Sequence, residues 1–248
     1  MRLQNKIALV TGAGSGFGKA IAETYAREGA KVAVVDIDAR AAKDVAGAIG
    51  PAAIAVACDV SRKADVDAAA AATVSAFGTI DILVNNAGTS HRNRPMLEID
   101  EAEFDRVFAV NVKSIFLFAH AVIPEFRRHG GGVVINIGST AGIRPRPGLA
   151  WYNATKGAVN LLSKSMAVEL APDKIRVCAL APVAGETALL PTFLGSEDPA
   201  VRAKFVASVP LGRLSLPQDV ANAALFLACD EAAFLTGVVL EVDGGRCV

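Results

Sequence analysis

The sequence predicts an α/β fold in which helices cover both faces of one parallel sheet of seven strands. Short apolar runs rich in β-branched residues alternate along the chain with longer helical stretches. Alternation of this kind implies right-handed crossovers between parallel strands. Hydrophobic residues make up 52% of the 248 residues, with few aromatics. That composition suits a sheet buried on both faces under closely packed helices.

The expected elements follow one another without interruption. The strands are the apolar runs at residues 7–10, 31–35, 53–57, 80–84, 133–137, 175–180 and 238–242. The helices between them are expected at residues 16–29, 39–48, 63–77, 101–128, 152–171 and 217–229. No linker or repeat divides the chain, so residues 1–248 are expected to form a single domain.

Charge and cysteine usage argue against several classes of protein. The 25 basic and 25 acidic residues balance and form no basic run, so nucleic acid is not an expected partner. The cysteines and histidines show neither disulfide nor metal-ligand spacing; they are Cys58, Cys178, Cys229, Cys247, His91, His120 and His129. The chain leads directly into its first strand, and no apolar run reaches the length of a membrane span. We therefore expect a reduced, cytoplasmic protein with neither metal nor membrane contact.

The first turn predicts a dinucleotide site. Thr11-Gly-Ala-Gly-Ser-Gly-Phe-Gly18 lies between the first strand and the first helix. Gly12 allows the turn, Gly16 lets the backbone approach a pyrophosphate, and Gly18 permits close packing. The helix amides that follow, near Ser15 and Phe17, then face the phosphates. This indicates a Rossmann-like, doubly wound domain, with a spacing one residue longer than the common fingerprint.

Asp36 selects the form of the cofactor. It ends the second strand about 20 residues beyond the glycines, where an acid accepts hydrogen bonds from the adenosine ribose. Its charge would repel a 2′-phosphate, and Ser15 and Ile37 offer no cation in compensation. We therefore predict NAD rather than NADP, although a strand-end Asp can also simply cap the next turn.

The next two strands add cofactor contacts at their carboxyl ends. Asp59 and Val60 follow the third strand, where side chains can reach the adenine. Asn85-Asn-Ala-Gly88 ends the fourth strand, and its small residues let the backbone approach a cofactor closely. The expected contacts here are Asn86, Ala87 and Gly88.

The proton-transfer chemistry is carried by Tyr152 and Lys156. Residues four apart on a helix share one face, and an adjacent ammonium favours the phenolate, so the tyrosine pKa is expected to fall below about 10. That makes a proton donor and acceptor usable near neutral pH. A Tyr-x-x-x-Lys pair alone is equally a surface helix pair. Together with Ser139 and the glycine-rich turn, it predicts hydride transfer at a carbinol or carbonyl carbon.

Taken together, these residues resemble the short-chain dehydrogenase/reductase family over essentially the whole chain. Asn111, Ser139, Tyr152 and Lys156 match its catalytic tetrad in order and spacing, and Val242-Asp-Gly-Gly245 is similar to its usual C-terminal ending. The resemblance implies that Tyr152 exchanges a proton with the substrate oxygen and that Lys156 also binds the nicotinamide ribose. It further implies that Ser139 holds the substrate oxygen and that Asn111 helps hold a water linking Lys156 to solvent.

One stretch departs from the family pattern. The family often has Asn-Pro-Gly after the sixth strand, followed by a Thr that contacts the carboxamide, whereas this chain reads Ala181-Pro-Val-Ala-Gly-Glu-Thr187. Pro182 and Thr187 fit as cofactor contacts, but Ala181 lacks the amide. This puts the local anchoring in question, not the reaction.

Substrate choice is expected to lie in three segments around the nicotinamide, namely 89–94, 140–146 and 184–208. The segment at about 183–210 is long and rich in Pro and Gly, which favours a lid or binding loop over a solvated insertion. Arg144 and Arg146 suit an anionic substrate group, such as that of a sugar acid or hydroxy acid, and can equally be solvated rim residues. Trp151 is either a pocket wall or a packing residue.

The sequence therefore predicts an NAD-dependent enzyme that interconverts a secondary alcohol and a ketone, with a sugar, polyol or hydroxy acid as the expected class of substrate. An NADH-dependent carbonyl or 3-oxoacyl thioester reductase is the alternative. A non-catalytic NAD-sensing protein is an alternative of another class, because fold does not fix function. The apolar faces near 101–128 and 152–171, with the family's habit of pairing these helices, predict a homotetramer.

Overall fold

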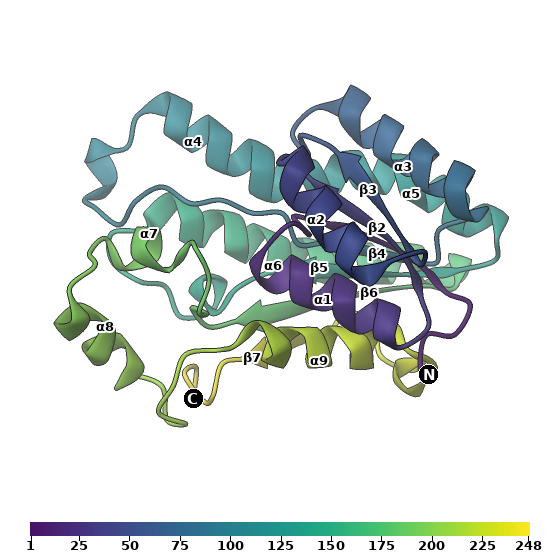
Figure 1. The fold of residues 1–248 in the computed structure, drawn as a ribbon. Helices are drawn as coiled ribbons and strands as arrows, with labels where there is room; N and C mark the ends of the chain where they lie inside the picture. Colours follow the sequence, from purple (N-terminus) through teal and green to yellow (C-terminus); the bar gives the residue numbers. More distant parts are fainter.

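The seven predicted strands are present and form one parallel sheet. The computed structural model describes residues 1–248 (Figure 1). The strand order is β3-β2-β1-β4-β5-β6-β7, and every neighbouring pair is parallel. The bounds are β1 Ile7–Thr11, β2 Lys31–Asp36, β3 Ala53–Ala57, β4 Ile82–Asn85, β5 Gly132–Ile137, β6 Ile175–Pro182 and β7 Val239–Val242. The order reverses direction between β1 and β4, which is where a doubly wound sheet binds its ligand.

Helices cover both faces of the sheet, as predicted. On one face lie α1 (Gly16–Arg27), α2 (Ala39–Ile49) and α9 (Pro217–Ala228), which pack on alternate strand residues such as Val10 and Val34. On the other lie α3 (Lys63–Phe77), α5 (Ser114–Arg128) and α6 (Ala150–Leu170), which pack on the intervening residues such as Leu9 and Val35. Short 3-10 turns occur at η1 Met96–Glu98, η3 Thr140–Gly142, η4 Ala171–Asp173 and η5 Asp230–Ala232.

The expected helix at 101–128 is interrupted by a π-helical turn. It consists of α4 (Glu101–Phe108), the π-turn η2 (Ala109–Lys113) and α5. The expectation that no segment is long and apolar enough for a membrane span is wrong for this stretch, whose mean hydropathy reaches 1.7. That hydropathy comes partly from residues such as Phe118 and Phe126, which are fully buried in the interior of the protein.

The segment at 183–210 is not a plain loop. It holds two helices, α7 (Leu190–Leu194) and α8 (Pro199–Val206), which the sequence reading missed. Two of its three prolines, Pro191 and Pro199, lie in the first turns of these helices, and Gly195 ends α7 in a left-handed conformation. The segment has a small apolar cluster of its own, formed by Val183, Leu190, Phe205, Val209 and Leu214.

Candidate active site

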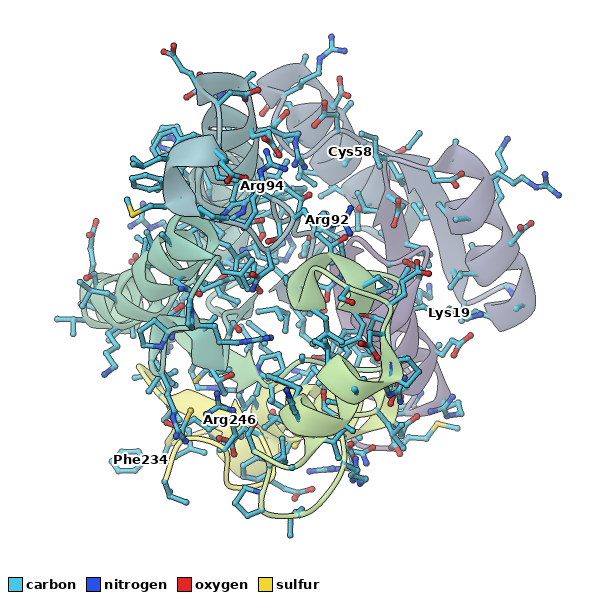
Figure 2. All side chains as sticks on the ribbon, turned by 90° about the vertical axis from the view of Figure 1, so that its left-hand side faces the viewer. Lys19, Cys58, Arg92, Arg94, Phe234 and Arg246 are labelled. Atoms are coloured by element: carbon cyan, nitrogen blue, oxygen red, sulfur yellow. The ribbon has the colours of Figure 1, made fainter.

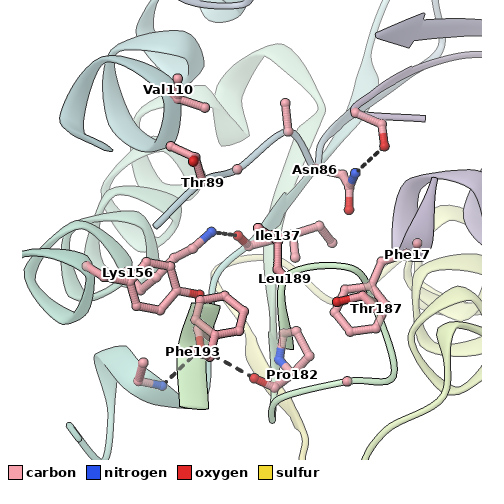
Figure 3. Close-up of a pocket in the computed structure, with 18 of the residues that line it drawn as sticks. Phe17, Asn86, Thr89, Val110, Ile137, Lys156, Pro182, Thr187, Leu189 and Phe193 are labelled. Atoms are coloured by element: carbon pink, nitrogen blue, oxygen red, sulfur yellow. Dashed lines mark hydrogen bonds between the residues drawn. The ribbon is translucent and has the colours of Figure 1, made fainter. Parts of the chain in front are cut away.

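A pocket of about 650 Å³ collects nearly all the predicted site residues. It opens at the carboxyl ends of the strands and is flanked by the segment that carries α7 and α8 (Figure 3). The predicted residues that line it are Gly12, Ser15, Gly16, Phe17, Asp36, Asp59, Val60, Asn86, Ala87, Gly88, Ser139, Arg144, Arg146, Tyr152, Lys156, Pro182 and Thr187. Gly18, Asn111 and Trp151 are not among the lining residues.

The glycine-rich turn is held closely against the end of β4. Gly12 and Gly16 have positive φ angles of 61° and 54°, which favour glycine. The Asn86 side-chain amide donates to the carbonyl oxygens of Thr11 and Gly12, at 2.8 and 3.0 Å. A Cβ at Gly18 would lie 2.2 Å from the Gly12 carbonyl oxygen. Gly18 therefore serves the close packing of the turn, as predicted, and is not itself a lining residue of the cofactor pocket.

Asp36 presents its charge to the pocket without a basic partner. Its carboxylate accepts hydrogen bonds from the backbone amides of Gly14, at 2.8 Å, and Asp38, at 3.0 Å. It forms no ion pair, and the neighbouring Ile37 lies in the pocket wall with 73% of its surface exposed. Asp36 thus does cap the next turn, the role that the sequence left open. Its unpaired carboxylate still faces the pocket, where it fits a ribose diol and disfavours a 2′-phosphate.

Asp59 lines the same end of the pocket and is held by a local turn. Its Oδ1 accepts the amide and hydroxyl of Ser61, at 2.9 and 2.7 Å. The Ser61 hydroxyl is the main reason that the pKa of this carboxyl lies below its usual value. Asp59, Val60 and Ile37 together form a wall suited to the flat face and edge of an adenine.

At the opposite end of the pocket, Tyr152, Lys156 and Ser139 lie close together. The Lys156 ammonium donates to the carbonyl oxygen of Ile137 at 2.7 Å and lies 5.9 Å from the centre of the Tyr152 ring. The Ser139 hydroxyl accepts from the Ala141 amide at 3.0 Å and lies 3.4 Å from the Pro182 carbonyl oxygen. Figure 3 shows Lys156 and its bond to Ile137 beside these hydrogen bonds.

The expected fall in the Tyr152 pKa is not found in the structure. Burial raises the pKa of Tyr152 to about 12, against a lowering effect of the Ser139 hydroxyl. Burial also lowers the pKa of Lys156 to about 8. Both side chains are largely removed from water, so desolvation of their charged forms outweighs the attraction between them. Tyr152 is therefore poised as a neutral phenol, a proton donor.

Asn111 lies behind the pocket, at the π-turn. Its side-chain oxygen accepts from the Thr89 amide at 2.8 Å, and its nitrogen donates to the Thr89 carbonyl at 2.9 Å and to the Thr155 hydroxyl at 3.0 Å. A Cβ at Gly88 would meet both the Asn111 oxygen, at 3.5 Å, and the Lys156 nitrogen, at 3.6 Å. Gly88 thus keeps open the space between the two side chains, and the water expected there stays a prediction.

Trp151 packs outside the pocket. Its indole N–H donates to the Met96 carbonyl at 3.3 Å, and its ring meets Phe104 edge-on at 5.4 Å. Neighbouring helical residues point about 100° apart, so Trp151 turns away from the pocket that Tyr152 faces. The packing alternative is correct, and the pocket-wall assignment is wrong.

The stretch with the missing amide closes over the glycine-rich turn. Ala181 is fully buried within β6, opposite Glu241 of β7. A Cβ at Gly185 would lie 2.5 Å from the Phe17 ring, and one at Gly16 would lie 3.4 Å from the Thr187 side chain. Close packing against Phe17 and Gly16 therefore positions Thr187, and this positioning does not need an amide side chain at position 181.

The structure adds residues that the sequence reading missed, among them Leu149, Phe193, Phe205 and Arg246. The Phe193 ring lies 5.0 Å from that of Tyr152. Arg246 belongs to the C-terminal segment, 94 residues after Tyr152. This separation in sequence gave no reason to expect it in the same pocket. The Val242-Asp-Gly-Gly245 ending was the available signal, because it predicts a turn that returns the chain to the sheet.

Comparisons with known proteins agree with this geometry. The family model described as "Enoyl-(Acyl carrier protein) reductase" matches residues 12–246. The chain is 48% identical to 4-formylbenzenesulfonate dehydrogenase of Comamonas testosteroni, covering 99% of each chain. It is 39% identical to 7alpha-hydroxysteroid dehydrogenase of Escherichia coli K12, covering 99% of this chain and 95% of that one.

Two solved structures share the fold. A 3-ketoacyl-(acyl-carrier-protein) reductase from Brucella melitensis, complexed with NADH, superimposes with a TM-score of 0.94 at 52% identity, covering 99% of this chain and 100% of that one. A 7 alpha-hydroxysteroid dehydrogenase complexed with NADH and 7-oxo glycochenodeoxycholic acid superimposes with a TM-score of 0.93 at 39% identity, covering 98% of this chain and 95% of that one. Both neighbours thus hold a nicotinamide cofactor on the same fold.

Proposed function

Because the chain belongs to the short-chain dehydrogenase/reductase family and is an oxidoreductase acting on CH–OH groups, we propose that it interconverts an alcohol and its carbonyl compound with NAD(H). The observation that carries this proposal is the arrangement of the pocket. Asp36 and the glycine-rich turn form one end, and Ser139, Tyr152 and Lys156 form the other.

The residues present fit a nicotinamide dinucleotide. Gly12 and Gly16 leave the turn without side chains, Asp36 faces the ribose position, and Asp59 with Val60 meets the adenine position. Lys156 would bind the nicotinamide ribose, and Thr187 and Pro182 would contact the carboxamide. When bound, the nicotinamide supplies or accepts the hydride. NAD(H) rather than NADP(H) follows from the unpaired charge of Asp36.

The chain's own groups manage the proton and the substrate oxygen. As a neutral phenol, Tyr152 donates its proton to the carbonyl oxygen during reduction and regains it from the alcohol during oxidation. The Ser139 hydroxyl holds the same oxygen and stabilises its developing charge. The Lys156 charge favours the phenolate that forms when the proton leaves.

Oxidation of an alcohol is the direction that Asp36 favours, because cellular NAD pools are mostly oxidised. Reduction of a carbonyl or a 3-oxoacyl thioester with NADH is the second candidate. It is supported by the 52% identity to a 3-ketoacyl-(acyl-carrier-protein) reductase. An apolar acyl chain and an aromatic aldehyde both suit a pocket lined by Leu149, Phe193 and Phe205.

The test is NAD reduction at 340 nm with a panel of secondary alcohols, polyols, sugars and hydroxy acids, run beside NADP. The reverse reaction is run with NADH and matching ketones, together with the aldehyde 4-formylbenzenesulfonate. Turnover with NAD(H) supports the proposal. No turnover with any member, combined with tight NADH binding, would instead favour the non-catalytic sensor.

Assembly into a homotetramer is part of the proposal. Apolar residues on α5 and α6 face solvent in the single chain, including Phe116, Leu161 and Val168, which are 57%, 66% and 80% exposed. Exposed apolar patches of this kind mark protein–protein interfaces. Light scattering at micromolar concentration is expected to give four times the 25.6 kDa chain mass; a monomer would refute the assembly.

A further inference from the structure

Two arginines from distant parts of the chain meet at one aromatic ring in the pocket wall. The guanidinium carbon of Arg146 lies 4.3 Å from the centre of the Phe205 ring, and that of Arg246 lies 5.9 Å from it. Arg146 precedes α6, Phe205 belongs to α8 and Arg246 belongs to the C-terminal segment. All three residues line the pocket. In Figure 2, Arg246 lies on the C-terminal segment (yellow), beside the segment of α7 and α8 (green).

Neither guanidinium has an acidic partner. Neither forms an ion pair, and the Nη1 atom of Arg246 is buried without any hydrogen-bond partner. Among the acids of this region, Glu241 lies beside Asp243 and Cys247 but forms no ion pair with either arginine, and two others are engaged elsewhere. Asp243 accepts the amides of Gly245 and Cys247, at 2.9 and 2.7 Å, and Glu186 pairs with Arg202. Two positive charges at the pocket wall are therefore left without a counter-ion from the protein.

The two charges also repel each other. Both side chains are partly buried, and burial, together with the charge of Arg246, lowers the pKa of Arg146. Holding two cations together at a half-buried site without a counter-ion is unfavourable. An anion bound at the two guanidinium groups would relieve the repulsion.

The tail that carries Arg246 is fixed in place. The Asp243 carboxylate holds the turn, and the Arg144 guanidinium donates to the Arg246 carbonyl oxygen. Arg144 thus supports the site by positioning the tail. A pair of arginines on ordered backbone is suited to binding an oxyanion with little loss of conformational entropy.

The wall between the arginines and Tyr152 is apolar. Leu149, Phe193 and Phe205 line the pocket there, and the Phe193 ring packs on Tyr152 at 5.0 Å. A ligand that spans this distance places its reacting carbon at Tyr152, its apolar body on the two phenylalanines and its far end at the arginines.

We propose that Arg146 and Arg246 form an oxyanion subsite, and that the substrate is an apolar or aromatic alcohol or carbonyl compound with an anionic group at the end remote from the reacting carbon. The placing of the reacting carbon rests on the proposed function, but the subsite can be tested by binding alone. Sulfonate, carboxylate and phosphate share the chemistry that two guanidinium groups recognise. Arg246 is then a specificity-determining residue contributed by the C-terminal segment.

The test compares ligands of the same shape and different charge. Binding of toluene-4-sulfonate and of neutral toluene-4-sulfonamide to the NAD-loaded enzyme is measured by isothermal titration calorimetry, with 4-methylbenzoate and 4-tolyl phosphate as further anions. The sulfonate is expected to bind at least about tenfold more tightly than the sulfonamide, the loss typical of one charge-assisted hydrogen bond. The strongest of the three anions identifies the natural anionic group.

Variants then show which residues produce the preference for sulfonate over sulfonamide. Arg146→Met and Arg246→Met are each expected to reduce this ratio of affinities at least about tenfold. Arg246→Lys, which keeps the charge, is expected to retain part of the ratio. Arg27→Met, an exposed arginine in the last turn of α1, is the matched control and keeps the full preference. Equal binding of sulfonate and sulfonamide to the wild type, or a preference that survives both methionine variants, would overturn the subsite. Turnover of neutral alcohols with NAD would leave the proposed function intact in that case.

Discussion

The Lys156 ammonium donates a hydrogen bond to the carbonyl oxygen of Ile137 at 2.7 Å, and this bond joins the catalytic helix α6 to the end of β5. Ser139 follows two residues after Ile137, so the same strand end positions the lysine and the serine. The bond satisfies one of three ammonium donors at a site only 5% exposed. The lysine is therefore held ready for a cofactor at a cost in stability of the free protein.

That cost predicts that Lys156→Met removes activity and stabilises the free protein. A gain of roughly 1 kcal/mol raises the Tm of a domain of this size by about 2–4 °C. Lys164→Met, on an exposed position of the same helix, is the control and is expected to change the Tm by less than about 1 °C. Differential scanning calorimetry without cofactor measures both, and a lower Tm for Lys156→Met would contradict the interpretation.

The same lysine predicts a pH dependence. Its pKa is lowered from 10.5 to about 8 on folding, so the unfolded chain binds more protons between these values. Stability of the wild type should therefore rise with pH across this window and fall as pH drops through about 8. Subtracting the Tm of Lys156→Met at each pH from 7 to 10 isolates the effect. A difference that does not change with pH would show that the folded-state pKa is not depressed.

Asp36 predicts a preference for NADH over NADPH and a way to weaken it. Asp36→Asn keeps a side-chain oxygen for the Gly14 amide but removes the charge. The ratio of kcat/KM for NADPH to that for NADH is expected to rise at least about tenfold, which corresponds to about 1.4 kcal/mol of lost repulsion. Steady-state kinetics with both cofactors measures the ratio. A wild type that prefers NADPH would show that Asp36 only caps its turn.

Gly18 and Gly47 form a matched pair for testing the packing of the cofactor turn. An alanine at 18 would bring its Cβ to 2.2 Å from the Gly12 carbonyl oxygen, whereas a Cβ at Gly47 in α2 meets nothing within 4 Å. Gly18→Ala is expected to lower the free energy of unfolding by about 1–3 kcal/mol and to weaken NADH binding. Gly47→Ala is expected to raise the free energy of unfolding by about 0.5–1 kcal/mol. Urea denaturation measures both; unchanged stability of Gly18→Ala would remove the packing role.

Much of the fold could be predicted because each strand is a short apolar run and each long helix lies between two such runs. The pocket followed from this, since parallel strands bring Gly12, Asp36, Asn86 and Ser139 to the same edge of the sheet. The place of Asn111 behind the pocket could not be predicted, because its hydrogen-bond partners Thr89 and Thr155 are remote in sequence. Helices α7 and α8 were not predicted, because a proline in the first turn of a helix cannot be distinguished by sequence alone from a proline in a loop.

The direction of the Tyr152 pKa shift was wrong because helical spacing gives the distance between two groups but not their burial. Arg246 was missed for a related reason, since only the folded C-terminal turn brings it to Arg146 and Phe205. Residues that lie at the carboxyl end of a strand could thus be placed from the sequence. Properties that depend on burial, or on contact with a segment remote in sequence, could not.

The most direct test of the central claim is the comparison of Tyr152→Phe with the wild type, in turnover and in NADH binding. The phenylalanine keeps the ring against Phe193 and removes the proton donor. We predict a fall in kcat of about 10²–10⁴-fold, with the dissociation constant of NADH unchanged within about threefold, a difference below 1 kcal/mol. Turnover that survives in Tyr152→Phe would contradict the account, because a proton donor other than Tyr152 would then have to carry the reaction.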